Sequence, residues 1–272
     1  MVASHLHRIA EMVKMEQFIV CITSSIPLLF VVFGIKYSSR VLKRIGLYLY
    51  LAMLGIVVSA HWHFQSVYGL PFFSSPSEMA IMALVLMLLG FFLLVAVLFG
   101  LIHDYFKHPE RFHQTKQGAL FILGLLAHLG VLGFLMYPLS GKWEYVNILK
   151  HAEKVFAKDE NIRDGKIRVE LVFSSPLPCW RNCSSEDYRH LFMVKNYTDE
   201  PMKVRLKIEL FDDRKESLDT IASLPIVVQP GEYRPVITKW TDEKSSVWDQ
   251  WSYRSEEPIA YFRYWYDARP VR

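Results

Sequence analysis

The sequence lacks the motifs that mark several common enzyme classes. It contains no glycine-rich phosphate-binding loop, no G-x-S-x-G nucleophile elbow and no H-E-x-x-H metal-binding pair. Only three of the 272 residues are cysteine, so at least one thiol has no disulfide partner within the chain. The net charge of +4 is small, and several cations lie between apolar segments, where they indicate membrane topology rather than nucleic-acid binding. These absences favour a non-enzymatic protein, although they leave an enzymatic role open.

One stretch, residues 79–102, has no charged residue and no Asn, Gln, Ser, Thr or Pro. At about 1.5 Å of rise per residue, a helix of this length crosses a hydrocarbon core of about 30 Å. The stretch is apolar on every side, so it lacks the polar stripe of a helix at the surface of a soluble core. It therefore predicts a transmembrane helix and an integral membrane protein.

Three further apolar segments accompany this stretch. Together the predicted spans are residues 18–35, 45–64, 79–102 and 119–139. No A-x-A-like cleavage site follows the first segment, which favours a span over a secretory signal. Because short connectors join the four spans, we predict an up-and-down four-helix transmembrane bundle in residues 1–140.

Basic residues are distributed unevenly among the connectors. Residues 36–44 carry four cations and no anion, residues 103–117 carry three cations, and residues 65–78 have no Lys or Arg. Lys and Arg favour the cytoplasmic side of a membrane, so the first and third connectors are predicted to lie inside. Both termini then lie outside the cytoplasm, which predicts a multi-pass protein, with a bacterial cytoplasmic membrane as the expected location.

The second half of the chain is charged and shows strand patterns. Residues 141–165 begin with apolar residues at helical spacing and are interpreted as a helical stalk or linker. The clearest strand is residues 203–210, in which apolar and charged residues alternate without exception. Antiparallel strands separated by turn signals predict an immunoglobulin-like β-sandwich in residues 166–272, and the whole chain is an α+β membrane protein. The runs are residues 167–173, 191–195, 203–210, 217–224, 226–229, 233–240 and 259–266.

The last run is rich in aromatic residues. Residues 261–266 read YFRYWY, which places aromatic side chains on both faces of one strand. A strand covered by the core on both faces is the favoured interpretation. A partner-binding surface is the alternative, because Tyr, Trp and Arg are the usual anchor residues of interfaces.

Part of the second half resembles a known kind of module. Residues 193–213, MVKNYTDEPMKVRLKIELFDD, followed by VQPGE at 228–232, look like the bacterial extracytoplasmic immunoglobulin-like modules of the FxLYD type. The C-terminal domain of the FixG/CcoG membrane proteins is similar too, although the redox cysteines of these families do not occur in the membrane half here. The resemblance covers about residues 189–240. It implies an envelope module for protein contacts or stability rather than a chemistry.

Histidines at the spans are candidate cofactor ligands. His61 and His63 end the second predicted span, and His128 lies in the middle of the fourth. A four-helix membrane bundle with facing histidines can bind haem b, which makes these three residues candidate haem ligands. For His128 we favour a hydrogen-bonded packing role, and proton or substrate handling is a third interpretation.

A second candidate site combines two thiols, an imidazole and a thioether. Cys179, Cys183, His190 and Met193 form the soft ligand set that copper prefers. Their order resembles the dinuclear copper loop of cytochrome oxidase subunit II, although six residues rather than three separate Cys183 from His190. In an oxidising compartment a Cys179–Cys183 disulfide is the preferred alternative, and thiol–disulfide exchange is the third.

A third motif is a candidate modification site. Asn196-Tyr-Thr matches the N-glycosylation pattern.

The leading functional hypothesis is a membrane protein that presents an extracytoplasmic immunoglobulin-like domain for partner binding or complex assembly. The alternative is a haem b- or copper-bearing subunit of a respiratory or oxidase-type membrane complex. A transporter or transporter accessory is the second alternative. The expected partners are the lipid bilayer and other membrane or envelope proteins, with no nucleic acid.

Overall fold

The computed structural model describes residues 23–35, 37, 39–107, 112–158, 166–177 and 187–271. A helical N-terminal half is followed by two small antiparallel sheets, so the fold is α+β, as predicted. The chain divides into two compact units, which are described separately below. Among the described residues, the helical unit contains those from Thr23 to Trp143 together with Lys244–Val247, and the β unit contains those from Glu144 to Glu243 and from Trp248 to Val271.

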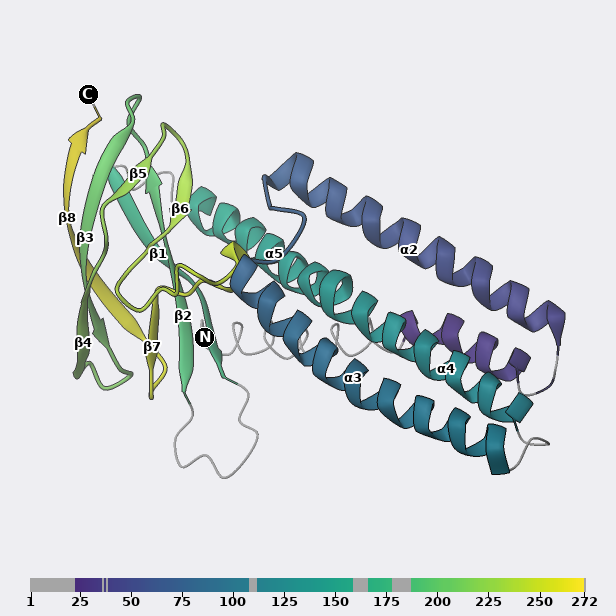
Figure 1. Ribbon diagram of the computed structural model, residues 1–272. Coiled ribbons are helices and arrows are strands. Elements are labelled where there is room, and N and C mark those ends of the chain that lie inside the picture. The colour runs from purple at the N-terminus through teal and green to yellow at the C-terminus, as the bar shows by residue number, and fades with distance from the viewer. Residues whose placement is uncertain are drawn as a thin grey trace. The chain divides into compact units, whose positions relative to one another are not determined.

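In the described residues, the helical half contains three long apolar helices and one shorter helix (Figure 1). Each long helix has the length and composition needed to cross a membrane, and the shorter helix is Thr23–Ile35. The long helices are α2 (Arg40–Tyr68), α3 (Pro76–Lys107) and a continuous run of α4 (Phe112–Val131), the π-helix η1 (Leu132–Met136) and α5 (Tyr137–Lys158).

Helix α3 contains the whole of the predicted span 79–102, and none of its residues is buried within the described part of the chain. Its exposed side chains include Leu88, Phe92 and Phe99. Water disfavours an apolar surface of this extent, whereas lipid does not. The exposure of α3 therefore agrees with a multi-pass membrane protein.

Two glycines allow helices of this unit to approach one another closely. A Cβ atom on Gly46 of α2 would lie 2.7 Å from Val31, and one on Gly133 of η1 would lie 2.8 Å from the sulfur of Met82 in α3. Small residues at such crossings let helix backbones come together in lipid, where packing rather than the hydrophobic effect drives association.

The fourth helical run differs from the prediction. The sequence suggested that a span ends at residue 139 and that a stalk begins at 141, whereas one helix continues from Gln117 to Ala157. Pro138 lacks an amide hydrogen, and its ring crowds the carbonyl of the residue four positions earlier. The wider turns of η1 directly precede Pro138, and they let the helix pass the proline without a break.

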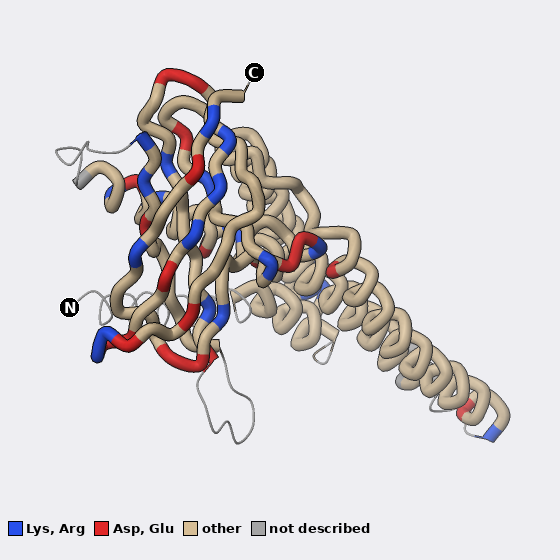
Figure 2. The backbone as a smooth tube through the Cα atoms, turned by 90° about the vertical axis from the view of Figure 1, so that its left-hand side faces the viewer, with Lys and Arg blue, Asp and Glu red and all other residues tan. Residues whose placement is uncertain are grey.

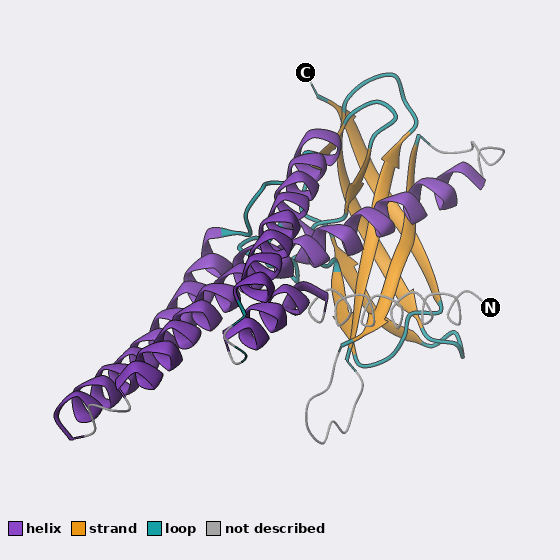
Figure 3. Cartoon of the chain, turned by 90° about the vertical axis from the view of Figure 1, so that its right-hand side faces the viewer, coloured by secondary structure: helices purple, strands orange, loops and turns teal. Residues whose placement is uncertain are grey.

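The β unit contains two antiparallel sheets (Figure 3). In one sheet β1 (Ile167–Pro176) pairs with β2 (Tyr188–Asn196), which also pairs with β6 (Tyr233–Pro235) and β7 (Tyr253–Ser255). In the other sheet β3 (Met202–Phe211) pairs with β4 (Ser217–Ala222), β5 (Ile226–Val228) and β8 (Tyr261–Pro270). Each predicted run contains a strand, and β7 is the strand that the sequence analysis missed.

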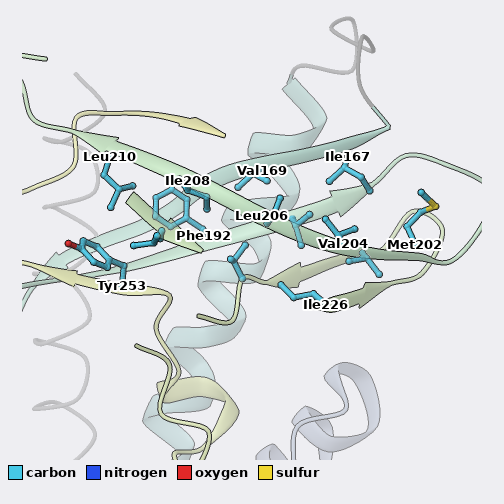
Figure 4. Packing of buried hydrophobic residues seen from close by; sticks show 14 of the residues in the cluster. Ile167, Val169, Phe192, Met202, Val204, Leu206, Ile208, Leu210, Ile226 and Tyr253 are labelled. Carbon is cyan, nitrogen blue, oxygen red and sulfur yellow. The ribbon is translucent and has the colours of Figure 1, made fainter. Parts of the chain in front are cut away.

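One hydrophobic core contains side chains from both sheets (Figure 4). The alternation predicted for β3 is confirmed, since Val204, Leu206, Ile208 and Leu210 are buried while Lys207 is exposed. From the other sheet, β1 and β2 contribute apolar residues that point toward β3, among them Ile167, Val169, Phe192 and Val194.

The opposite face of the β1–β2 sheet is covered by the end of α5. Ile148, Ala152 and Phe156 of the helix pack with Leu191 and Met193 of β2 in a second core. Consequently β2 is buried on both faces, which explains why it reads as a nearly continuous apolar run rather than an alternating one.

Candidate functional site

Among the described residues of the helical unit, Lys142 is the most deeply buried charged side chain. Lys142 and His61 are both fully buried, with no exposed surface. The ammonium nitrogen of Lys142 lies 2.8 Å from Nδ1 of His61 and donates to the carbonyl oxygen of Phe72 at 2.7 Å. Nε2 of His61 lies 2.9 Å from the carbonyl oxygen of Leu135, within η1. We call these four residues the Lys142–His61 cluster.

The hydrogen-bond pattern assigns the tautomer of His61. A carbonyl oxygen only accepts, so Nε2 carries a hydrogen and donates it to Leu135, and Nδ1 accepts from Lys142. A doubly protonated His61 would direct an N–H at the ammonium of Lys142. In this arrangement His61 is neutral, and the positive charge of the pair lies on the ammonium of Lys142. An ionisable pair within a membrane-spanning segment is a functional-site hypothesis by default.

His128 occupies a different position in the same unit. It is buried on α4, where Nε2 lies 3.2 Å from the hydroxyl of Ser25 and Nδ1 lies 3.4 Å from the hydroxyl of Tyr50. These contacts join three helices: Thr23–Ile35, α2 and α4. His63 is exposed on α2, beside the rings of Phe64 and Tyr68.

The structure does not bring the three candidate haem ligands together. His128 contacts Tyr50, which precedes His61 on α2 by about 16 Å at the usual helical rise. His61 is hydrogen-bonded to Lys142 and Leu135, whereas His63 is exposed on α2. Each histidine thus has its own surroundings, and a shared iron between His61 and His128 does not fit this geometry.

The candidate copper ligands are only partly described. Cys179 and Cys183 lie outside the described residues, so both the disulfide and the thiolate hypotheses stay predictions. His190 and Met193 are fully buried on β2 but face opposite sides of its sheet: His190 contacts Tyr253, and Met193 packs in the α5-facing core. One ion cannot bind both. In the described ranges there is no group of three His, Cys, Asp or Glu side chains that could hold a metal ion.

His190 is a neutral histidine within the β unit. Its Nε2 donates to the hydroxyl of Ser255 at 2.7 Å, and that hydroxyl donates onward to the carbonyl of Glu257. Its Nδ1 is buried and has no hydrogen-bond partner among the described residues. Burial lowers the pKa of His190 to about 3, because a protonated ring would place an unpaired N–H in the core.

Arg189, the neighbour of His190, points to the opposite side of β2. Its guanidinium lies 3.2 Å from a carboxylate oxygen of Glu144 on α5 and 4.0 Å from the ring of Trp251. It also lies 3.8 Å from a carboxylate oxygen of Asp249. This arrangement fixes α5 on the sheet, so we assign Arg189 a structural role.

The interpretation of residues 261–266 as a covered core strand is wrong. Strand β8 pairs only with β3 among the described strands and therefore forms an edge of its sheet. Along β8 no residue is fully buried, and Tyr261, Trp265 and Tyr266 are 53%, 52% and 40% exposed. On the inward side of β8, Phe262 and Tyr264 are partly covered by the core, whereas Tyr266 stays exposed.

The outward side of β3 and β8 is basic. Figure 2 shows cationic positions recurring along these strands. We define the basic sheet face as the outward-facing charged residues of the two strands, which are Lys203, Arg205, Lys207, Glu209, Arg263, Asp267 and Arg269. Cations outnumber anions on this face. Trp265 of β8 lies opposite Lys207 of β3, among these charged residues. The alternation of β3 and the aromatic run of β8 are both visible in the sequence. Local patterns do not show, however, that these two strands are paired.

Comparison of the chain with protein-family models, with curated proteins and with solved structures gave no match.

Proposed function

We propose that this chain is a membrane protein whose β domain lies outside the cytoplasm and binds another envelope protein through the basic sheet face. In this proposal residues 1–140 form a four-helix transmembrane bundle, residues 141–165 connect it, and residues 166–272 form an immunoglobulin-like sandwich. The three long apolar helices support the membrane part. The two antiparallel sheets over a common core, and the resemblance to FxLYD-type modules, support the sandwich.

The exposure of β8 is the observation that carries the proposal. Large aromatic side chains beside arginines are the usual anchors of protein interfaces. Here Trp265 is about half exposed and lies between Arg263 and Asp267 on the same face. An excess of cations favours a partner with an acidic surface, because complementary charge speeds association and excludes other partners.

A buried site in the helical unit favours a second candidate function. The Lys142–His61 cluster places one positive charge in the interior of membrane-spanning helices. Such groups mark proton or ion pathways in many membrane proteins. A transporter, or an accessory of one, is therefore the second candidate.

Photocrosslinking in the full-length chain tests the partner-binding proposal. A photoreactive residue replaces Lys207 on the basic sheet face, and a matched variant carries it at Asp213, an exposed turn position of the same unit. Crosslinks to a defined protein from the first position, abolished by Arg205→Glu, are expected. Equal crosslinking from both positions would overturn the role of this face.

Protease protection tests the proposed orientation. Protease added to cells with a permeabilised outer envelope should cut within residues 141–272, because the basic connectors are expected to face the cytoplasm. Protection of that half together with cutting in residues 36–44 would show the opposite orientation.

A further inference from the structure

Among the described strands β8 has one open edge, and the backbone groups along this edge can be assigned residue by residue. Val271 donates to the carbonyl of Pro201 at 2.9 Å, in the register that pairs β8 with β3. In an antiparallel ladder successive residues direct their backbone groups to alternate sides. The odd-numbered residues of β8 therefore bond to β3, and the even-numbered ones direct N–H and C=O groups to the open edge. These even-numbered residues are Phe262, Tyr264, Tyr266 and Ala268.

The outward residues of β8 form a self-complementary series around Trp265. In order they are Tyr261, Arg263, Trp265, Asp267 and Arg269. We propose that β8 pairs antiparallel with β8 of a second copy of this chain, with Trp265 opposite the same residue of that copy. Arg263 then lies opposite Asp267 of the other copy, twice by symmetry. Tyr261 lies opposite Arg269, also twice.

The same register suits the inward side chains and the backbone. Phe262 lies opposite Ala268 of the second copy, a large residue against a small one, and Tyr264 lies opposite Tyr266. These are the even-numbered residues, whose backbone groups face the open edge, so they form the hydrogen-bonded pairs. Trp265 then falls at a non-hydrogen-bonded pair, where Cα atoms approach to about 4.5 Å and aromatic side chains pack well.

Neighbouring symmetric registers are less favourable. Centring the pair on Arg263 or on Asp267 places like charges directly opposite one another, which is destabilising. Centring it on Tyr266 places Arg263 opposite Arg269. Centring it on Tyr264 avoids the conflict but forms neither Arg–Asp pair. The charge pattern of β8 thus selects the register centred on Trp265.

Pairing also covers a strand that would otherwise be exposed. A long edge strand with unpaired backbone groups tends to associate, and natural proteins usually cover or interrupt it. Anchoring in one membrane raises the effective concentration of two copies, so a modest interface is sufficient. The inference rests on the proposed function, in which the β domain is a contact module, and it names a second copy as the occupant of the β8 edge.

Cysteine crosslinking of the full-length protein in lipid nanodiscs or native membranes tests the register. In a background with Cys21→Ser, Cys179→Ser and Cys183→Ser, diamide oxidises two adjacent thiols to one disulfide and is itself reduced to a hydrazine. Trp265→Cys should link to itself. Arg263→Cys and Asp267→Cys should link only when the two variants are expressed together. The control is Arg205→Cys on β3, away from the open edge, which should give about tenfold less dimer, reflecting tethering alone.

A variant that removes one backbone N–H distinguishes specific strand pairing from random encounters of two copies in the membrane. Tyr266→Pro removes an edge N–H without removing a bond to β3, and proline is tolerated at such edge positions. It should abolish the Arg263–Asp267 crosslink while the protein stays folded, as monitored by thermal unfolding. Equal crosslinking at Arg205, or no dimer from any β8 position, would overturn self-pairing. If self-pairing is overturned but the photoreactive residue at position 207 still crosslinks to a different protein, the proposed function stands without the homodimer.

Discussion

The ammonium of Lys142 donates a hydrogen bond to Nδ1 of His61 across 81 positions of sequence, and neither side chain is exposed. The ring of Phe72 lies against His61, with centroids 4.7 Å apart and the ring planes tilted by 32°, and the Phe72 carbonyl accepts a second bond from Lys142. The pair therefore joins α2, the α2–α3 connector and α5 through polar contacts in an otherwise apolar interior.

Removing either member of this pair should destabilise the helical unit. Lys142→Met leaves Nδ1 of His61 and the Phe72 carbonyl without this donor. Each buried group that stays unpaired should lower the free energy of unfolding by about 1–3 kcal/mol. His61→Phe leaves the ammonium buried with fewer partners. The double variant should cost less than the sum, as expected for residues in direct contact. Thermal unfolding in detergent measures the three variants. Lys150→Met, an exposed position on the same helix, should have little effect.

Acid should destabilise the β unit through His190. The pKa of His190 is about 3 in the folded state and near 6.5 when the chain is unfolded. Above pH 6.5 the ring is neutral in both states, so stability does not depend on it. Between pH 6.5 and about 3 only the unfolded state gains the proton. The free energy of unfolding should therefore decrease by roughly 1.4 kcal/mol for each unit by which the pH is lowered across that window.

The matched variant for this titration is His190→Leu. It removes the titrating ring, and it also loses the bond to Ser255, so it should be less stable at pH 7. Its stability should nevertheless decline less steeply between pH 6.5 and 4 than that of the parent protein. Parallel curves for the two proteins, measured by denaturant unfolding, would show that His190 is not the responsible group.

The sequence predicted the elements whose signal is local. Strand β3 follows from strict alternation, and α3 follows from a long apolar run. Strand β7 was missed because three residues cannot establish a period. The apparent end of the span at residue 139 was misleading because the composition becomes more polar there, and a change in polarity does not show where a helix ends. Here a π-helical turn lets the helix continue.

The candidate sites were less predictable, because they depend on which elements become neighbours. His61 and His128 could be singled out by residue type, since histidine is uncommon within spans. Nothing in the local sequence connects His61 with Lys142, which looked like part of a polar stalk. Similarly, the aromatic pattern of β8 does not distinguish a strand covered on both faces from a strand at the edge of a sheet. Only the pairing with β3 alone distinguishes the two.

The two sides of β3 should respond differently to the same charge. Ile208→Asp places a carboxylate in the core between the sheets, where the parent side chain is fully buried. Lys207→Asp places it at the exposed side of the strand. The first variant should unfold the β unit, since losing the burial alone costs about 1.5–3 kcal/mol before the buried charge is counted. The second should change stability by less than about 1 kcal/mol. Similar unfolding temperatures for the two variants would contradict the packing of β3.

The side chain of Asn196 is enclosed in the turn after β2. It is fully buried, and its amide nitrogen donates to the carbonyls of Glu200 at 2.8 Å and Val228 at 3.0 Å. Its side-chain oxygen accepts from the backbone N–H and the hydroxyl of Thr198. The amide nitrogen that would carry a glycan is thus occupied within the fold.

Asn196 should therefore act as a structural residue rather than a glycosylation site. Asn196→Asp should be destabilising although the two side chains have the same shape, because a carboxylate oxygen would face two carbonyl oxygens. The expected cost is about 1–3 kcal/mol for each carbonyl left without its donor, measured by denaturant unfolding. Thr198→Val, which also destroys the glycosylation pattern but removes only a hydroxyl, should cost less. Equal losses of stability in the two variants, together with a mass increase on Asn196, would instead show that the residue carries a glycan.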